Sequence, residues 1–340
     1  MTKQRRITLT DVAKEAGVSG CLASKIISGK DEGVWIAAET KERILKAAHK
    51  LNYKPNLQAR QLARGRKDAI GIFIDKSSDF NSRFVMASVK GIVTKAEELG
   101  FTVNLGLSHP GSDIKLIETG AIDSAILIPA DRRLGEELEG TLTREHIPTI
   151  KLNPGLWVDE NSVCCDDTGG MKQAVAHLTE LGHRRIVYIG SPTEHASGGT
   201  RLAAYRNAMA EAALEALTLE SGTILLPEIV EQAVRGLNAT AVILYHDEML
   251  VDLHMACNRL GIRIPDDLSV VGINDLEDAT RFIPATTDVH IPIFDMGIAA
   301  VELLEKQIRL GAPVPSVLIP ESLIVRDSCA PVTDGVREKS

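Results

Sequence analysis

Two kinds of hydrophobic pattern divide the chain. Over roughly the first 60 residues, apolar positions recur every three or four residues, the spacing of short amphipathic helices. From Ala69 onward, short apolar runs such as AIGIFI and SAILIPA alternate with helical stretches. Alternation of this kind is typical of parallel sheets with crossover helices. The pattern therefore predicts a small helical head followed by a large α/β body.

The first two helices of the head are predicted to form a helix-turn-helix. Thr10 is placed to cap the first helix, Gly17 to end it, and Ser19 to cap the second. The apolar positions that face each other are Val12, Ala13, Ala16, Leu22, Ala23, Ile26 and Ile27. The outward positions of the second helix are Gly20, Cys21, Ser24 and Lys25. In a helix-turn-helix, this outward face enters the major groove of DNA.

Any small three-helix unit would show the same spacing of apolar residues, so the distribution of charge is needed to favour a DNA-binding helix-turn-helix. A third helix is predicted from Glu39 to about Leu51, with outward Lys41, Arg43, Lys46 and Lys50 expected at phosphates. Residues 1–66 hold 14 Lys and Arg against 6 Asp and Glu, whereas the rest of the chain holds 24 against 40. A basic head on an acidic body predicts that nucleic-acid contacts are confined to the head.

A short basic helix is predicted after the head. In YKPNLQARQLARGRK, Pro55 breaks the third helix and Asn56 is suited to cap a new one. Its apolar residues Ala59, Leu62 and Ala63 lie among arginines that include Arg60. An isolated helix of this length is marginal in water, so we expect it to order only when something holds it.

Taken together, these motifs resemble the LacI/GalR family of bacterial transcription regulators. The resemblance rests on TLTDVAKEAGVS, on ETKERILKAAHKLNYKPNLQARQLARGRK, and on later motifs such as DDTGG, HLTELGHRRIVYIG and LGIRIPDDLSVVGIND. It implies a cytoplasmic homodimer that binds a near-palindromic double-stranded DNA operator, represses transcription and responds allosterically to a small-molecule effector. It also implies a body like a periplasmic sugar-binding protein, with two lobes of doubly wound parallel sheets.

The resemblance also implies which residues contact DNA. Hinge helices of the two subunits would pair in the minor groove, where Leu62 would wedge between base pairs. The alternative for Leu62 is a core leucine. Gly20 and Cys21 depart from the family pattern and leave direct base readout thin, and the loop before the third helix resembles the longer form of the fructose- and sucrose-repressor branch. The expected DNA-binding residues are Thr10, Ser19, Gly20, Cys21, Ser24, Lys25, Asn56, Ala59, Arg60, Leu62 and Ala63.

The same resemblance sets the expected boundaries. The head spans residues 1–54, the hinge helix and linker 55–68, and the body 69–340. Within the body, the first lobe is expected over about 69–161 and 291–322, and the second over about 162–290 and 323–330. The strand runs expected in the second lobe include TILLP, residues 223–227.

Six residues are expected at the effector site: Phe84, Asn153, His195, Arg201, His246 and Asn274. The Arg201 fork suits two ligand oxygens, although a surface ion pair is the alternative, and either histidine is equally readable as a satisfied polar residue. Asn153 and Asn274 stand where many relatives carry aspartates for sugar hydroxyls. Losing those charges favours an anionic, sugar-like effector such as a phosphosugar, while asparagine also suits neutral hydroxyls.

Other functions find little support in the sequence. No GxGxxG after a strand, GxxxxGK[ST], HExxH or GxSxG is present, so no enzyme, catalytic residue, cofactor or metal site is expected. Five cysteines without a CxxC pair indicate reduced thiols, and the basic start leads into no apolar segment. The final residues hold no leucine heptads, which favours a dimer over a tetramer. The alternative function is a cytosolic small-molecule binding protein with little specific DNA recognition.

Overall fold

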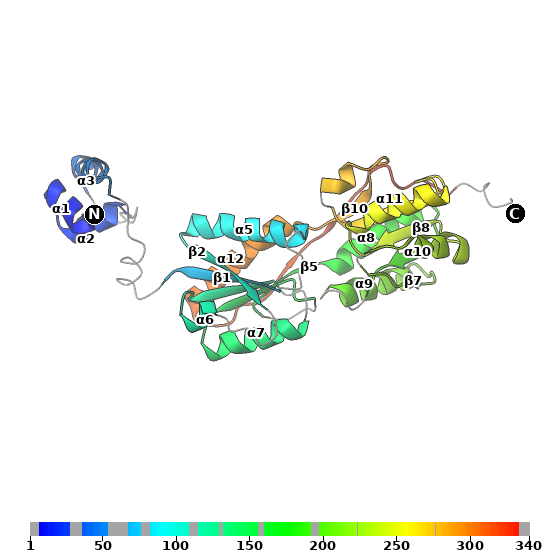
Figure 1. The fold of residues 1–340 in the computed structure, drawn as a ribbon, viewed down its shortest axis with the longest axis horizontal. Coiled ribbons are helices and arrows are strands. Elements are labelled where there is room, and N and C mark those ends of the chain that lie inside the picture. The colour runs from blue at the N-terminus through cyan, green and yellow to red at the C-terminus, as the bar shows by residue number, and fades with distance from the viewer. Residues whose placement is uncertain are drawn as a thin grey trace, which may run out of the picture. The chain divides into compact units, whose positions relative to one another are not determined.

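The chain forms two compact units, residues 1–67 and residues 68–340, drawn in Figure 1. This computed structural model describes residues 7–27, 36–53, 67–75, 82–108, 115–128, 132–155, 160–191, 197–222, 224–275 and 277–332. The hinge residues Asn56, Ala59, Arg60, Leu62 and Ala63, and also His195, lie outside these ranges. Within the described ranges, no helix combines the length and the apolar character needed to cross a membrane.

The head consists of α1 (Leu9–Ala16), α2 (Gly20–Ile27) and α3 (Ala38–Lys50). Of the apolar residues predicted to face each other, Val12, Ala13, Ala16, Ala23 and Ile26 are buried, together with Ile44 and Ala47 of α3, while Leu22 and Ile27 are partly buried against them. The helix-turn-helix is therefore confirmed. The buried side chains of the head core are all alanine, valine or isoleucine, so this core is small and aliphatic.

The cap of the first helix differs from the prediction. Thr8 is the N-cap, and Thr10 lies inside α1. The Thr8 hydroxyl accepts the Asp11 N–H at 3.3 Å, while the Asp11 carboxylate accepts the Thr8 N–H at 2.8 Å. Asp11 lies three residues after Thr8, which permits this reciprocal capping box. Ser19 caps α2 as predicted by accepting the Leu22 N–H at 3.3 Å, and Gly17 ends α1 with a left-handed φ of 64°.

The first half of the body is a six-stranded parallel sheet in the order β11-β5-β4-β3-β1-β2. Helices α5 and α12 cover one face and α6 and α7 the other (Figure 1). The strands are β1 (Ala69–Asp75), β2 (Thr102–Ser108), β3 (Ser124–Ile128), β4 (Thr149–Leu152), β5 (Ser162–Cys165) and β11 (Val317–Ile319). The helices are α5 (Arg83–Leu99), α6 (Lys115–Glu118), α7 (Arg132–Arg144) and α12 (Ile293–Leu310).

The second half repeats the arrangement in the order β12-β10-β9-β8-β6-β7, and only β12 runs antiparallel to its neighbour among the described strands. Its strands are β6 (Ile186–Ile189), β7 (Leu217–Leu219), β8 (Ala241–Leu244), β9 (Ser269–Asn274), β10 (Thr287–His290) and β12 (Ser322–Ile324). Its helices are α8 (Asp167–Glu180), α9 (Gly198–Glu211), α10 (Pro227–Glu231), η1 (Gln232–Gly236), α11 (Met249–Leu260) and η2 (Glu277–Thr280). The predicted α/β class with two parallel-rich sheets is confirmed.

Two details of the predicted body are wrong. The strand expected at residues 223–227 lies earlier, at Leu217–Leu219, and Pro227 instead begins α10. Proline has no N–H to donate to a sheet and fits the first turn of a helix. Ser162–Cys165, assigned to the second lobe, pairs with β4 and β11 in the first sheet. The chain therefore first crosses between sheets at Asp166, and it crosses again after His290 and at Pro320–Glu321.

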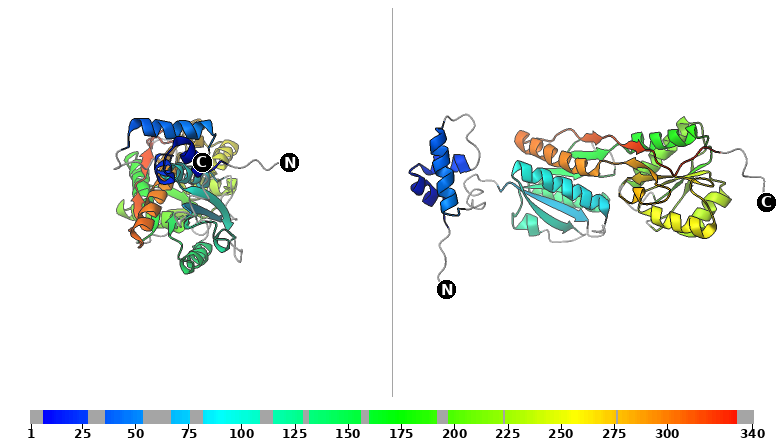
Figure 2. Two further views of the ribbon diagram at one scale, coloured as in Figure 1. Left: turned by 90° about the vertical axis from the view of Figure 1, so that its left-hand side faces the viewer. Right: turned by 90° about the horizontal axis from the view of Figure 1, so that it is seen from above.

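Two glycines allow α5 and α12 to approach closely on the first sheet. A Cβ on Gly91 would lie 2.0 Å from the Phe294 carbonyl oxygen, and one on Gly297 would lie 2.4 Å from that of Ser88. Figure 2 shows the two helices side by side when the body is seen from above. Ile92 of α5 and Val301 and Leu304 of α12 are buried in the core that the two helices share with the sheet.

Candidate functional site

The face of the head expected on DNA is exposed. Ala23 and Ile26 point into the head core, which leaves Gly20, Cys21 and Ser24 at the surface of α2. Lys25, on the same helix, is half-buried, while Ser19 and Thr10 are exposed beside it. The face is poor in hydrogen-bonding groups because Gly20 has no side chain and a thiol is only a weak donor. Lys25 is its sole cation among the described residues of α2.

The bases of α3 face outward, as their spacing predicts. In this structure Lys46 pairs with Glu42 at 2.8 Å and Lys50 pairs with Glu15 at 2.6 Å. Arg43 donates from Nε to the Ala16 carbonyl oxygen at 2.9 Å and so covers the end of α1. Exposed ion pairs of this kind contribute little to stability, so exchanging them for phosphate contacts costs the fold little.

Arg201 is the centre of a buried hydrogen-bond network in the body. It extends from the first turns of α9 and is only 3 % exposed. Its Nε donates to Asp167 Oδ1 at 2.9 Å, and its two terminal nitrogens donate to the Tyr245 carbonyl oxygen at 2.7 Å and to Asn274 Oδ1 at 3.1 Å. Burial lowers the pKa of Arg201, but the charges of Asp167, Tyr245, Cys165 and Glu321 together outweigh burial and raise the pKa overall. Arg201 is thus a permanently charged, fully oriented fork.

Asn274 lies at the end of β9, where the backbone has a φ of 111°. Its Oδ1 accepts a hydrogen bond from Arg201 Nη2, and its Nδ2 donates to Asp247 Oδ1 at 3.2 Å. Asp247 and Tyr245 follow β8, the neighbouring strand. The carboxyl ends of parallel strands lie at one edge of the sheet, where such folds bind ligands.

Asn153 reaches the same network from the first sheet. It follows β4 in a left-handed conformation with a φ of 49°. The Cys165 thiol lies 3.4 Å from Asn153 Oδ1 and 3.7 Å from Asp167 Oδ1. Cys165 therefore connects Asn153 to the ion pair of Asp167 with Arg201. The structure brings together three residues expected at the effector site, two of them from the second half of the body and one from the first.

Two further expected residues occupy different surroundings. His246 is buried beside this network, with its ring edge-on to Tyr245 and the ring centroids 4.9 Å apart. The Tyr245 ring in turn lies 5.2 Å from the Arg201 guanidinium carbon. Phe84, near the start of α5, is half-buried and packs against the apolar core of the body. His246 thus adjoins the network through Tyr245, whereas the described contacts of Phe84 are those of a core aromatic residue.

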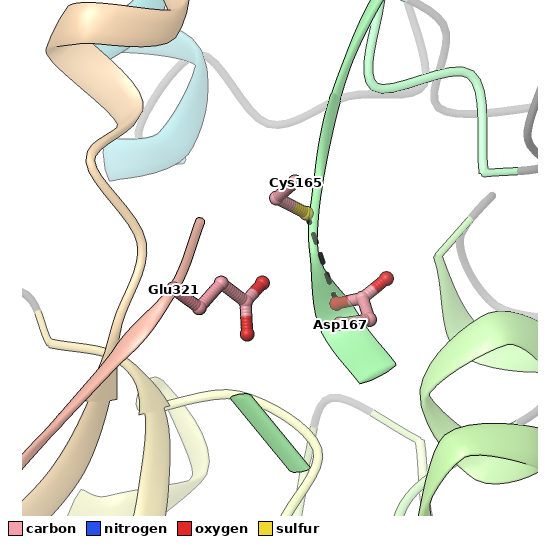
Figure 3. Close-up of side chains that lie close together, drawn as sticks. All are labelled: Cys165, Asp167 and Glu321. Atoms are coloured by element: carbon pink, nitrogen blue, oxygen red, sulfur yellow. Dashed lines mark hydrogen bonds between the residues drawn. The ribbon is translucent and has the colours of Figure 1, made fainter. Parts of the chain in front are cut away.

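Three acid groups of the network were not among the expected residues (Figure 3). In the sequence, Asp167 stands out only as part of the DDTGG motif, and Cys165 only as one of five cysteines expected to be reduced thiols. Glu321 lies 154 residues after Asp167 and shows no pattern in the sequence that connects the two. Burial raises the pKa of the Glu321 carboxyl, and the charge of Asp167 raises it further. Asp167 thus supplies a negative charge to a site at which Asn153 and Asn274 replace the aspartates of many relatives.

Known protein families match both units of the chain. Residues 8–56 match the family model described as "Bacterial regulatory proteins, lacI family", and residues 175–329 match the "Periplasmic binding protein-like domain". The transcriptional regulator CelR of Thermobifida fusca is 29% identical over 96% of this chain and 100% of its own length. The lactose operon repressor of Escherichia coli K12 is 26% identical over 94% of this chain and 90% of its own.

Solved structures agree with the sequence relatives. A Lac repressor dimer bound to operator and the anti-inducer ONPF has a TM-score of 0.76 at 25% identity, and the match covers 96% of this chain and 100% of that one. A complex of the regulator CelR with cellobiose has a TM-score of 0.66 at 27% identity, covering 95% of this chain and 100% of that one. The similarity therefore extends over both the head and the body.

Proposed function

Because this chain belongs to the LacI/GalR family of bacterial transcription regulators, we propose that it represses transcription by binding operator DNA through α2 and responds to a sugar-like effector at Arg201. Like its named relatives, the chain is a DNA-binding regulator and not an enzyme. The observation that supports the proposed DNA contact best is the exposed outer face of α2 in a basic head. We further propose a cytoplasmic location, because a bacterial transcription regulator acts where the DNA is.

The proposed assembly on DNA is a dimer. The relative with operator bound is a dimer, and a two-fold dimer matches a near-palindromic site with one head on each half. In this arrangement the hinge residues Asn56, Ala59, Arg60, Leu62 and Ala63 meet their counterparts at the centre of the operator. Because α2 offers few base-reading groups, the central kink and the shape of the DNA carry a large share of the specificity.

The proposed effector is an uncharged polyhydroxy compound. From the sequence alone, an anionic effector was favoured, because Asn153 and Asn274 carry no charge to balance that of Arg201. In the structure all three kinds of nitrogen on Arg201 donate to protein oxygens, and Asp167 balances its charge. An anion at this point would meet Asp167 and Asp247 as well as Arg201, whereas hydroxyl groups both donate and accept and so suit the mixed network. The CelR relative with cellobiose bound takes a sugar of this class.

Coupling between the two sites is proposed to run through the lobes. Asn153 follows a strand of the first sheet, while Arg201 and Asn274 belong to the second. The Thr200 hydroxyl donates to the Gly155 carbonyl oxygen, which makes a further contact between these halves. A ligand that touches residues of both halves stabilises one lobe arrangement over another, and that difference sets whether the hinge helices pair on DNA.

Selection of DNA from a random pool tests the DNA-binding half of the proposal. The full chain should enrich a near-palindromic site and bind it at least about 10³-fold more tightly than a scrambled duplex at equal salt. Lys25→Ala should weaken binding to that site. Equal affinity for both duplexes would instead support a small-molecule binding protein without specific DNA recognition.

Calorimetry with matched sugars tests the effector half. Neutral mono- and disaccharides are compared with their phosphates and acids, using the full chain, Arg201→Met, and Arg206→Met as an exposed control on the same helix. The proposal expects a neutral sugar to bind, Arg201→Met to abolish that binding and Arg206→Met to leave it unchanged. Tighter binding of a phosphosugar than of its neutral parent would contradict it.

A further inference from the structure

Three side chains of types that commonly bind metals lie close together where the chain crosses between the two sheets of the body. Cys165 ends β5, Asp167 begins α8, and Glu321 lies between β11 and β12. One donor atom from each lies within 4.8 Å of the other two, and all three residues are buried (Figure 3). Each of two separate crossings therefore supplies part of a single cluster of thiol and carboxyl groups.

The spacing of Cys165 and Asp167 fits two ligands of one metal ion, and the Glu321 donor lies within 4.8 Å of both. With bonds of about 2.3 Å to sulfur and about 2.1 Å to oxygen, two ligands of a tetrahedral ion stand about 3.6 Å apart. Cys165 Sγ and Asp167 Oδ1 are separated by 3.7 Å. Asn153 Oδ1 lies 3.4 Å from the same sulfur, so an amide oxygen borders the cluster as well.

Glu321 provides the observation that separates this cluster from an ordinary group of acids. It is only 6 % exposed, and its Oε1 has no hydrogen-bond partner among the described residues. Figure 3 shows its carboxyl group directed toward Cys165 and Asp167. Gly170 of α8 makes room for it, because a Cβ there would lie 1.9 Å from Glu321 Oε2. An unpartnered buried oxygen is costly unless a ligand satisfies it.

Charge balance favours a divalent cation. When a metal ion displaces the protons of Cys165 and Glu321, the cluster of one thiolate and two carboxylates carries three negative charges, of which Arg201 balances one through Asp167. A doubly charged ion balances the other two. The Arg201 hydrogen bond to Asp167 also orients that carboxylate, as outer-shell partners of metal ligands commonly do.

We propose that Cys165, Asp167 and Glu321 bind a zinc-like divalent ion at the crossings between the two sheets. The single thiolate selects a borderline ion such as Zn²⁺ or Co²⁺ over the hard ions Mg²⁺ and Ca²⁺, which prefer oxygen ligands alone. Cys165 and Asp167 are two residues apart, but Glu321 follows 154 residues after Asp167, so no spacing motif in the sequence indicates the full set of ligands. The metal site adjoins the proposed sugar site, because Asp167 also pairs with Arg201 and Cys165 also contacts Asn153, but metal binding can be measured with neither DNA nor sugar present.

Cobalt serves as the probe because cobalt bound to a thiolate absorbs strongly in the near ultraviolet. The reduced, metal-free full chain is titrated with Co²⁺ at pH 8 in the presence of excess Mg²⁺. We expect one Co²⁺ per chain with a thiolate-to-cobalt band, displaced by Zn²⁺. Cys165→Ser should abolish the band, and Glu321→Gln should weaken binding by more than about 100-fold, because loss of an outer-shell partner alone costs 10–100-fold.

The matched control is Cys164→Ser, which alters the preceding residue of the same strand, on its opposite face. It should retain the band. Thermal unfolding of each metal-free variant establishes that it is folded, and Glu321→Gln decides the question if Cys165→Ser does not fold. No stoichiometric binding, or a band that survives Cys165→Ser or Glu321→Gln, would overturn the site. Binding of selected DNA in EDTA is measured in parallel, so that failure of the metal site and failure of the repressor function are distinguishable.

Discussion

The head and the body differ in how far apart in sequence their decisive contacts lie. In the head, Thr8 meets Asp11 and Ser19 meets Leu22, each three residues along the chain. In the body, Arg201 meets Asp167 across 34 residues and Asn274 across 73. The head is built from local capping and a small aliphatic core, whereas the site of the body exists only once two sheets have assembled.

This difference predicts separate responses to salt, mutation and pH. The proposed DNA contacts are exposed charges and helix-surface groups, which the solvent screens. The proposed effector contacts are buried, and their hydrogen bonds and ion pair act in a medium of lower dielectric. Each prediction below perturbs one region and uses the other as its reference.

The largest expected effect is loss of the head fold in Ile44→Ala. Ile44 is fully buried in the head core, and a cavity of this kind costs about 2–5 kcal/mol, a large part of the stability of so small a unit. DNA binding should disappear while sugar binding and the main melting transition of the body remain. Leu45→Ala, at the exposed neighbouring position, is the control and should bind DNA normally.

The next effect is the salt dependence of the two affinities. If the dimer makes 6–10 phosphate contacts, DNA affinity should fall by about 10³–10⁵ between roughly 50 and 200 mM salt. Sugar affinity, measured by calorimetry over the same range, should scarcely change. A DNA affinity as flat as the sugar affinity would show that the basic head does not make these contacts.

Arg201→Met should destabilise the body by about 3–5 kcal/mol, since removal of one partner leaves a buried charge uncompensated. For a unit of this size that corresponds to a decrease of roughly 10 °C in Tm, read from the main transition by calorimetry. Arg263, paired with Asp267 at the surface, supplies the control: Arg263→Met should leave the Tm unchanged. Equal effects of the two substitutions would contradict the account of the buried network.

The smallest effect concerns the pH dependence of body stability at Asp288. Burial, with the charge of Asp247 adding to it, raises the pKa of this carboxyl well above its ordinary value. The folded chain thus keeps a proton that the unfolded chain loses, and the stability this contributes at low pH is lost as the pH rises. Asp288→Asn stays neutral throughout, so its Tm relative to the natural chain should increase from pH 5 to pH 8. A difference independent of pH would contradict this assignment.

Local structure in the head was predictable from the sequence almost completely. The three helices, the buried positions and the Ser19 cap follow from spacing and capping preferences. Thr10 was expected to cap α1, although Asp11 stands at the position that completes a capping box with Thr8. The signal that identifies the correct cap is the acidic residue three positions after Thr8.

Pairing and side-chain convergence in the body were predictable only in part. The class of fold follows from the alternation of strands and helices, but an apolar run such as Ser162–Cys165 does not indicate which of two sheets it joins. Arg201, Asn153 and Asn274 were anticipated at one site. Glu321 was not, because nothing local marks a residue whose role depends on a crossing 154 residues away. His195 and the hinge remain predictions.

The coupling between the two regions is measured most directly by one titration. The full chain binds a fluorescent duplex carrying its selected site, with and without a saturating neutral sugar shown by calorimetry to bind. The account predicts that the sugar changes the Kd for this duplex by about 5–150-fold, the usual size of an allosteric coupling, and leaves binding to a scrambled duplex much less affected. A bound sugar that leaves the Kd for the selected site unchanged would contradict it.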